Sequence, residues 1–158
     1  MIRQATPDDA SALNAIAKAI GLFQPHELEE MDGMIAEYFN GNLGDSHTWI
    51  VSGDTPTMGA AYYAPEAFCD DGGTWNLYFI GVDPTAQGQG IGSALLTYIE
   101  QRLTQCGARL LLVETSGVES FEQTRKFYRK SGFAEEARIR DFYKPGDDKI
   151  IFRKVLTP

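Results

Sequence analysis

The chain has 158 residues, of which 43% are apolar and 11% aromatic, and its formal net charge is −8. This length and composition predict one folded domain, residues 1–158, with a substantial core, and they exclude a disordered chain. The negative charge argues against a nucleic-acid or anionic-membrane partner and favours cationic substrates such as amines.

Neither a targeting segment nor a membrane span is visible in the sequence. Met1–Gln4 leads into no apolar stretch, and no apolar run reaches the length of a membrane-spanning helix. We therefore expect a cytoplasmic protein. Cys69 and Cys106 lack metal-ligand spacing, so we expect free thiols in a reducing compartment and no metal site.

The N-terminal part of the chain shows strand patterns around two helices. Thr6, Pro7 and two acids form a helix start, and Gly21 is suited to end that helix. Gly53-Asp54-Thr55-Pro56 is a turn cluster between two strands. The expected elements are a strand at 2–5, helices at 6–21 and about 26–39, and strands at 47–52 and 58–64.

The rest of the chain continues with strands and helices in alternation. Its expected elements are strands at 75–82 and 109–115, helices at 90–106 and 119–130, and a final hairpin of 136–143 and 149–155. The strand at 75–82 is nearly all apolar, which indicates a central place in the sheet. Hairpins combined with a strand-helix-strand crossover predict a mixed α/β (α+β) sheet with helices on both faces.

A glycine-rich loop, Gln87-Gly88-Gln89-Gly90-Ile91-Gly92, lies between that strand and the next helix. Glycines allow the chain to bend and a phosphate to approach the backbone. The first turn of the helix adds free N–H groups and the positive end of the helix dipole. A pyrophosphate binds such a loop without a cationic side chain, and this loop contains neither Lys nor Arg.

The same loop carries a family resemblance. Gln87-x-x-Gly90-x-Gly92 resembles the acyl-CoA motif of the GNAT acetyltransferase superfamily, and Arg125–Phe133 is similar to its next motif, an aromatic-Tyr helix end followed by Gly-Phe. The resemblance covers about 75–133. It implies the GNAT fold, a central mixed, mostly antiparallel sheet flanked by helices on both faces. It also implies an N-acetyltransferase that transfers an acetyl group from acetyl-CoA directly to a primary amine.

The resemblance further implies which residues contact acetyl-CoA. The loop backbone binds the pyrophosphate, the pantetheine arm lies along the end of the preceding strand, and an N–H near Val82 polarises the thioester carbonyl. For Gly81, the alternative is close packing against the crossover helix. The expected contacts are Ile80, Gly81, Val82, Gln87, Gly88, Gln89, Gly90, Ile91, Gly92 and Ser93.

Tyr128 is the candidate general acid, because similar proteins place the Tyr that protonates the CoA thiolate four residues before the glycine, here Gly132. A phenol is a suitable donor to a thiolate of comparable basicity. The alternative is a core aromatic side chain that pairs with Phe127. Nearby, Arg125, Lys126, Arg129 and Lys130 make a basic helix end that complements the helix dipole.

The general base is where the chain departs from the family. Asn76 lies where several members have a catalytic Glu, and an amide cannot accept a proton at neutral pH. Three alternatives stay open. Tyr78, on the same strand face, could orient a water; Glu114, at the end of the neighbouring strand, could act as base or amine anchor; or a chain of waters could suffice.

The acceptor site is expected at the final hairpin, where Asp141, Tyr143 and Asp147 could hold and stack on a cationic amine. The alternative is a Pro-Gly turn with solvated acids. A small-molecule amine is the expected acceptor, with a protein N-terminus or lysine as the alternative. Two other readings are a non-catalytic acyl-CoA-binding domain and a dinucleotide-binding unit. Dimers are frequent in such proteins, and the oligomeric state stays open.

Overall fold

The computed structural model describes residues 1–53 and 55–157, so Asp54 of the expected turn lies outside the described residues. The helices and strands follow the predicted order. They are β1 (Ile2–Gln4), η1 (Pro7–Asp9), α1 (Ala10–Ile20), α2 (Pro25–Phe39), β2 (Thr48–Ser52), β3 (Gly59–Pro65), β4 (Thr74–Val82), η2 (Pro84–Ala86), α3 (Ile91–Gln105), β5 (Leu110–Ser116), η3 (Glu119–Phe121), α4 (Glu122–Lys130), β6 (Ala134–Lys144) and β7 (Asp147–Val155).

The strands form a seven-stranded sheet in the order β1-β2-β3-β4-β5-β7-β6. β4 and β5 run parallel, whereas β1–β2, β2–β3, β5–β7 and β6–β7 are antiparallel pairs. The predicted mixed, mostly antiparallel sheet with the 75–82 strand at its centre is therefore confirmed. The chain divides into two compact units, residues 1–64 with 79–99, and residues 65–78 with the chain from Glu100 onward.

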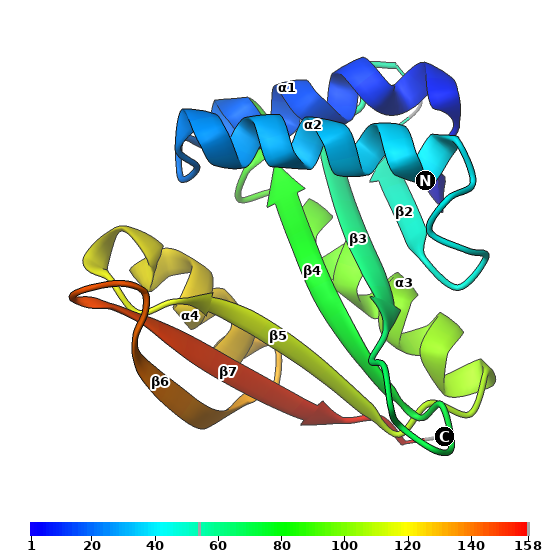
Figure 1. Ribbon diagram of the computed structural model, residues 1–158. Coiled ribbons are helices and arrows are strands. Elements are labelled where there is room, and N and C mark those ends of the chain that lie inside the picture. Colours follow the sequence, from blue (N-terminus) through cyan, green and yellow to red (C-terminus); the bar gives the residue numbers. More distant parts are fainter. Residues whose placement is uncertain (54, 158) are drawn as a thin grey trace. The chain divides into compact units, whose positions relative to one another are not determined.

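In the first unit, helices cover both faces of the strands. Leu13, Ile16 and Ala17 of α1 follow helical spacing and are buried against β2 and β3. Figure 1 shows α1 and α2 side by side over these strands. On the other face, a Cβ built on Gly59 of β3 would lie 3.1 Å from Leu95 of α3. The predicted two-faced covering is thus confirmed here.

The first helical segment starts at a buried acid. Asp9 accepts hydrogen bonds from the Thr6 N–H (2.8 Å) and from both Nη atoms of Arg3 (2.8 and 2.9 Å). The hydrogen bond from Arg3 is the main cause that lowers the pKa of Asp9 to about 2. The ionised carboxylate therefore stabilises the fold above about pH 4, and this stabilisation is lost as the pH falls from about 4 to about 2.

Replacing Asp9 with Asn should therefore lower stability in a pH-dependent way. At pH 7 we expect a loss of about 1–2 kcal/mol, because the ion pair and the charge-assisted hydrogen bonds with Arg3 disappear, whereas the Asn side-chain oxygen can still accept the Thr6 N–H. The difference in melting temperature between wild type and Asp9→Asn should shrink as the pH falls from about 4 to about 2. A difference that stays constant over this range would contradict the assigned role of the carboxylate.

In the second unit, β5, β7 and β6 lie side by side and α4 packs on one face. Tyr128 packs against Phe133 and Phe152, and all three side chains are buried. The final hairpin is longer than predicted, since β6 reaches Lys144 and β7 already starts at Asp147. The left-handed φ of Gly146 (83°) permits this tighter turn. No helix in the described ranges is both long and apolar enough to span a membrane.

Candidate functional site

The glycine-rich loop of the first unit is tied to the end of β4. Asp83 Oδ1 accepts a hydrogen bond from the Thr85 N–H (2.9 Å) and so caps the short turn η2. Gln87 Nε2 donates to the Val82 carbonyl (3.2 Å), which links the loop back to the strand. The side chain of Gln87 therefore has a structural role, and its backbone remains available to a ligand.

The geometry of the loop suits an anionic group. Gly88 and Gly90 have φ values of 78° and 82°, and a Cβ built on either meets no atom within 4 Å. The first hydrogen bond of α3 runs from the Ala94 N–H to the Gly90 carbonyl (2.9 Å). The N–H groups of Ile91–Ser93 precede it and lie at the free, positive end of the helix. The loop therefore has the geometry of an anion-binding site, and binding of the coenzyme A pyrophosphate to it stays a prediction.

Gly81, expected to lie along the pantetheine arm, is buried by close packing. A Cβ at this position would come against Ile20 of α1 and lie 2.8 Å from the ring of Phe79. Close packing, the alternative considered for Gly81, is therefore present, and the atoms nearest to the Cβ position belong to Ile20 of α1 and to Phe79. Its neighbours Ile80 and Val82 are partly exposed.

A substitution at Gly90 tests the loop. Gly90→Val should weaken coenzyme A binding more than about tenfold, because a branched side chain would project from a backbone that a phosphate must approach closely. Gly107→Val is a matched control at the other end of α3. It has a similar φ of 80° and an equally open surrounding. Calorimetry that finds equal coenzyme A affinity in both variants would remove the loop from the binding site.

Tyr128, the candidate acid of the second unit, is buried in α4 with an exposed fraction of 4%. Its ring packs against Phe127, Phe133 and Phe152, with centroid distances of 5.5 to 5.8 Å. Burial raises the pKa of the phenol above its ordinary value of 10.0. The hydroxyl therefore keeps its proton throughout the physiological range, as a donor must. The role of Tyr128 as general acid stays a prediction.

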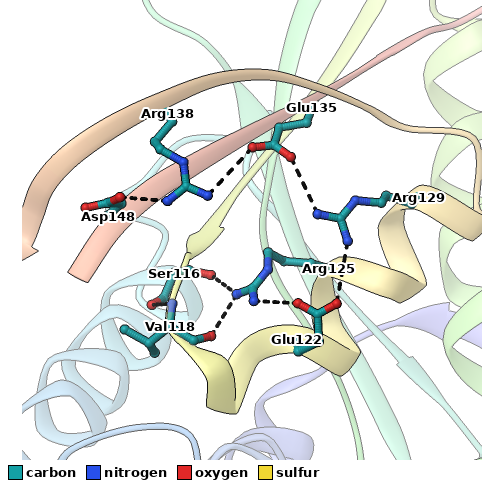
Figure 2. Close-up of polar contacts among 8 residues, drawn as sticks. All are labelled: Ser116, Val118, Glu122, Arg125, Arg129, Glu135, Arg138 and Asp148. Atoms are coloured by element: carbon teal, nitrogen blue, oxygen red, sulfur yellow. Dashed lines mark hydrogen bonds and ion pairs between the residues drawn. The ribbon is translucent and has the colours of Figure 1, made fainter. Parts of the chain in front are cut away.

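Arg125, one turn before Tyr128, points inward although the sequence suggested only a basic helix end. It is 7% exposed. As Figure 2 shows, Nη1 donates to the carbonyls of Ser116 (2.7 Å) and Val118 (2.8 Å), and Nη2 donates to Glu122 (2.6 Å). Arg125 thus fixes the end of β5 to the helix that carries Tyr128. The only sequence signal for it is the Glu122–Arg125 spacing of three residues.

An exposed ion-pair network links α4 to the final hairpin (Figure 2). Arg129 contacts Glu135 at 3.5 Å, and Arg138 contacts Glu135 at 4.0 Å and Asp148 at 2.6 Å. Pairs of this kind contribute little individually in water. The network nevertheless shows that the acids of the hairpin are largely engaged within the second unit.

The acids predicted to hold the acceptor take part in hydrogen bonds of the turn. Asp141 Oδ1 accepts the Gly146 N–H (2.8 Å), and the Asp141 N–H donates to Asp148 (2.9 Å). Asp147 accepts a hydrogen bond from the Ser116 hydroxyl. These contacts give both predicted residues a structural function in the hairpin.

Tyr143 belongs to an aromatic cation site that the chain fills itself. Lys149 Nζ lies 3.6 Å from the ring centroid of Phe142 and 6.0 Å from that of Tyr143. The same ammonium forms an ion pair with Glu114 at 3.3 Å. The cation on these rings is thus a side chain of the protein, and stacking of the rings on an acceptor amine stays a prediction. Glu114 consequently carries a neutralising partner.

A further polar cluster lies at the end of the β4–β5 ladder. The ladder pairs 74–77 with 110–113, so Tyr78 and Glu114 are the first residues beyond it, on the same face as Asn76. Asn76 is 2% exposed, and its Nδ2 donates to Glu66 Oε1 (2.7 Å). Burial, and then the charges of Glu66 and Glu114, raise the pKa of the Tyr78 phenol. Glu66 is a candidate that the sequence reasoning missed.

No group of three His, Cys, Asp or Glu side chains in the described ranges is arranged to hold a metal ion. The titratable groups of the second unit instead form two different environments. Around Glu114 the charges are balanced by Lys149. Around Glu66 a carboxylate is held by a neutral amide. Such a set contains groups that can hold an amine and accept a proton.

Comparison with known proteins identifies the family. Residues 44–135, more than half of the chain, match the model of the acetyltransferase (GNAT) domain. A search of curated proteins gave no match. A solved structure from Desulfovibrio desulfuricans, assigned to the GNAT acetyltransferase family, is 33% identical, with a TM-score of 0.92 and 99% of both chains covered.

More distant structures share the fold. Ribosomal-protein-S18-alanine N-acetyltransferase of Escherichia coli is 22% identical, with a TM-score of 0.77, and the match covers 100% of this chain and 94% of that one. An aminoglycoside 6′-N-acetyltransferase complexed with coenzyme A is 15% identical, with a TM-score of 0.76 and coverage of 100% and 98%. The four antiparallel strand pairs named above also distinguish this sheet from the parallel sheet of a dinucleotide-binding unit. The chain therefore belongs to the GNAT family of acetyltransferases.

Proposed function

We propose that the protein transfers the acetyl group of acetyl-CoA directly to a primary amine of a small molecule. The observation that carries this proposal is the loop before α3, where Gly88 and Gly90 adopt positive φ values and lead into the free N–H groups of the helix. Family membership supports acetyl-CoA as the donor, and a related fold has been solved with coenzyme A bound.

The chemistry of the residues suggests a role in the reaction for each of them. The loop binds the pyrophosphate, and Ile80–Val82 hold the pantetheine arm through the strand backbone. As the amine nitrogen bonds to the acetyl carbon, the carbon–sulfur bond breaks and Tyr128 gives its proton to the departing thiolate. The proton lost by the amine passes to a carboxylate of the second unit, with Tyr78 or a water between them. Glu114 and Glu66 are the two carboxylates near Tyr78.

A small cationic amine is the acceptor class that the charge of the chain favours, since a net charge of −8 attracts cations. The structural neighbours act on different acceptors, a ribosomal-protein alanine in one case and an aminoglycoside in another. Acetylation of a protein N-terminus or lysine is therefore the second candidate. A non-catalytic acyl-CoA-binding domain is the third. The cytoplasmic location and a homodimer stay predictions.

An acceptor screen tests the proposal. The full chain is incubated with acetyl-CoA and a panel of alkylamines, polyamines, amino sugars, amino acids and short peptides, and free thiol is measured against time. We expect thiol release with at least one small amine and formation of its N-acetyl product by mass spectrometry. Release with peptides alone would favour the second candidate. Coenzyme A binding without thiol release on any amine would favour the non-catalytic domain.

A further inference from the structure

Asn76 leaves one end of a buried amide without a partner. Its Nδ2 donates to the Glu66 carboxylate, and since an ionised carboxylate only accepts hydrogen bonds, the orientation of the amide is fixed by chemistry. Its Oδ1 is buried and has no hydrogen-bond partner among the described residues. Buried polar atoms are nearly always satisfied in folded proteins. Asn76 Oδ1 therefore requires a hydrogen-bond donor that the described residues do not provide.

The Glu66 carboxylate lacks a cationic partner among the described residues. It directly follows β3, and its N–H donates to the Thr74 carbonyl (2.9 Å), which holds it beside β4. Its side chain is partly buried and takes part in none of the ion pairs found within 1–53 and 55–157. Glu114 differs, because Lys149 already neutralises it. A carboxylate without a cation thus lies next to an amide oxygen without a donor.

One kind of ligand supplies both missing partners. A primary ammonium has three N–H donors, one positive charge and no acceptor. It can donate to the free carboxylate oxygen of Glu66 and to Asn76 Oδ1 at once, and its charge balances the carboxylate. Tyr78, which is 49% exposed, lies on the strand face of Asn76 and near enough for the Glu66 charge to raise the pKa of its phenol, so an exposed side chain borders the cluster.

We propose that Glu66 and Asn76 form the binding site for the primary ammonium group of the acceptor, with the exposed Tyr78 beside it. This inference rests on the proposed function. Glu66 then accepts one proton from the bound ammonium, which gives the nitrogen the lone pair that bonds to the acetyl carbon. As the carbon–sulfur bond breaks, Tyr128 protonates the thiolate, and the second proton that the nitrogen loses passes through water to Tyr128. Several family members have a catalytic Glu at the position of Asn76. In this chain Glu66, ten positions earlier and hydrogen-bonded to Asn76, supplies the carboxylate. Glu114 and Lys149 remain a structural ion pair.

Binding of n-butylammonium to the coenzyme A complex tests this site without turnover. Calorimetry should find a dissociation constant at least about tenfold weaker in Glu66→Gln, which keeps a hydrogen bond to Asn76 and removes the charge. Asn76→Leu, which preserves the buried volume, should weaken the same binding. Glu136→Gln removes an exposed carboxylate of β6 and should match wild type. Coenzyme A affinity should change less than about threefold in all three.

The acceptor screen separates this site from the proposed function. If wild type releases thiol with a small amine, the KM for that amine should rise at least about tenfold in Glu66→Gln while the KM for acetyl-CoA stays constant. If no amine is acetylated but butylammonium binding depends on Glu66, the site stands and the proposed reaction fails. The site is overturned if wild type does not bind butylammonium. It is also overturned if Glu66→Gln leaves both the dissociation constant of butylammonium and the KM for the amine unchanged, or if Glu114→Gln alone weakens butylammonium binding.

Discussion

Tyr128→Phe is expected to lower kcat by about two orders of magnitude while the dissociation constant for acetyl-CoA changes less than about threefold. The substitution removes only the hydroxyl and keeps the ring that packs on Phe133 and Phe152. The fold and coenzyme binding should therefore persist, whereas the departing thiolate loses its proton donor. Steady-state kinetics with the best acceptor, together with calorimetry, measure the two effects separately.

The buried position of Tyr128 also predicts the form of the pH profile. Because burial raises the pKa of the phenol, the hydroxyl stays protonated above the ordinary range of tyrosine. Phenol ionisation should therefore not lower the wild-type rate below about pH 10. Tyr98→Phe, in α3, is the matched control and should keep the wild-type rate. If Tyr128→Phe also keeps it when chemistry limits turnover, another group protonates the thiolate and Tyr128 is a core residue.

Most of the fold could be predicted because local patterns determine it. The apolar spacing of α1 and the caps at Thr6 and Gly21 place that helix correctly, and the structure begins and ends it as expected. The final hairpin was placed less accurately. Its length depends on the two-residue turn at Gly146 and on a register shift between Ile139 and Lys144, neither of which periodicity reveals.

The cofactor loop and Tyr128 could be proposed from contiguous motifs, but Glu66 could not. Its relation to Asn76 arises only because a loop folds back and places residues ten positions apart side by side. Lys149 was missed for the same reason, since its contacts with Glu114 and Phe142 depend on strand register. Such pairings depend on the tertiary structure, and the periodicity of a single sequence contains no signal for them.

Arg125→Met should destabilise the protein by about 3 kcal/mol. The guanidinium is the donor for the carbonyls of Ser116 and Val118, and methionine retains the aliphatic volume but offers no N–H. The Ser116 carbonyl belongs to a residue that is 6% exposed, so water does not readily replace the donor. Urea denaturation measures the change in free energy of unfolding.

Arg129→Met provides the matched control, because Arg129 lies on the same helix but is exposed. Its side chain is 45% exposed and reaches Glu122 at 3.9 Å and Glu135 at 3.5 Å. Surface pairs of this kind contribute at most about 1 kcal/mol. Arg125→Met should also lower kcat, since the helix that carries Tyr128 would no longer be fixed to the end of β5. Equal losses of stability in the two variants would show that Arg125 acts only as a surface charge.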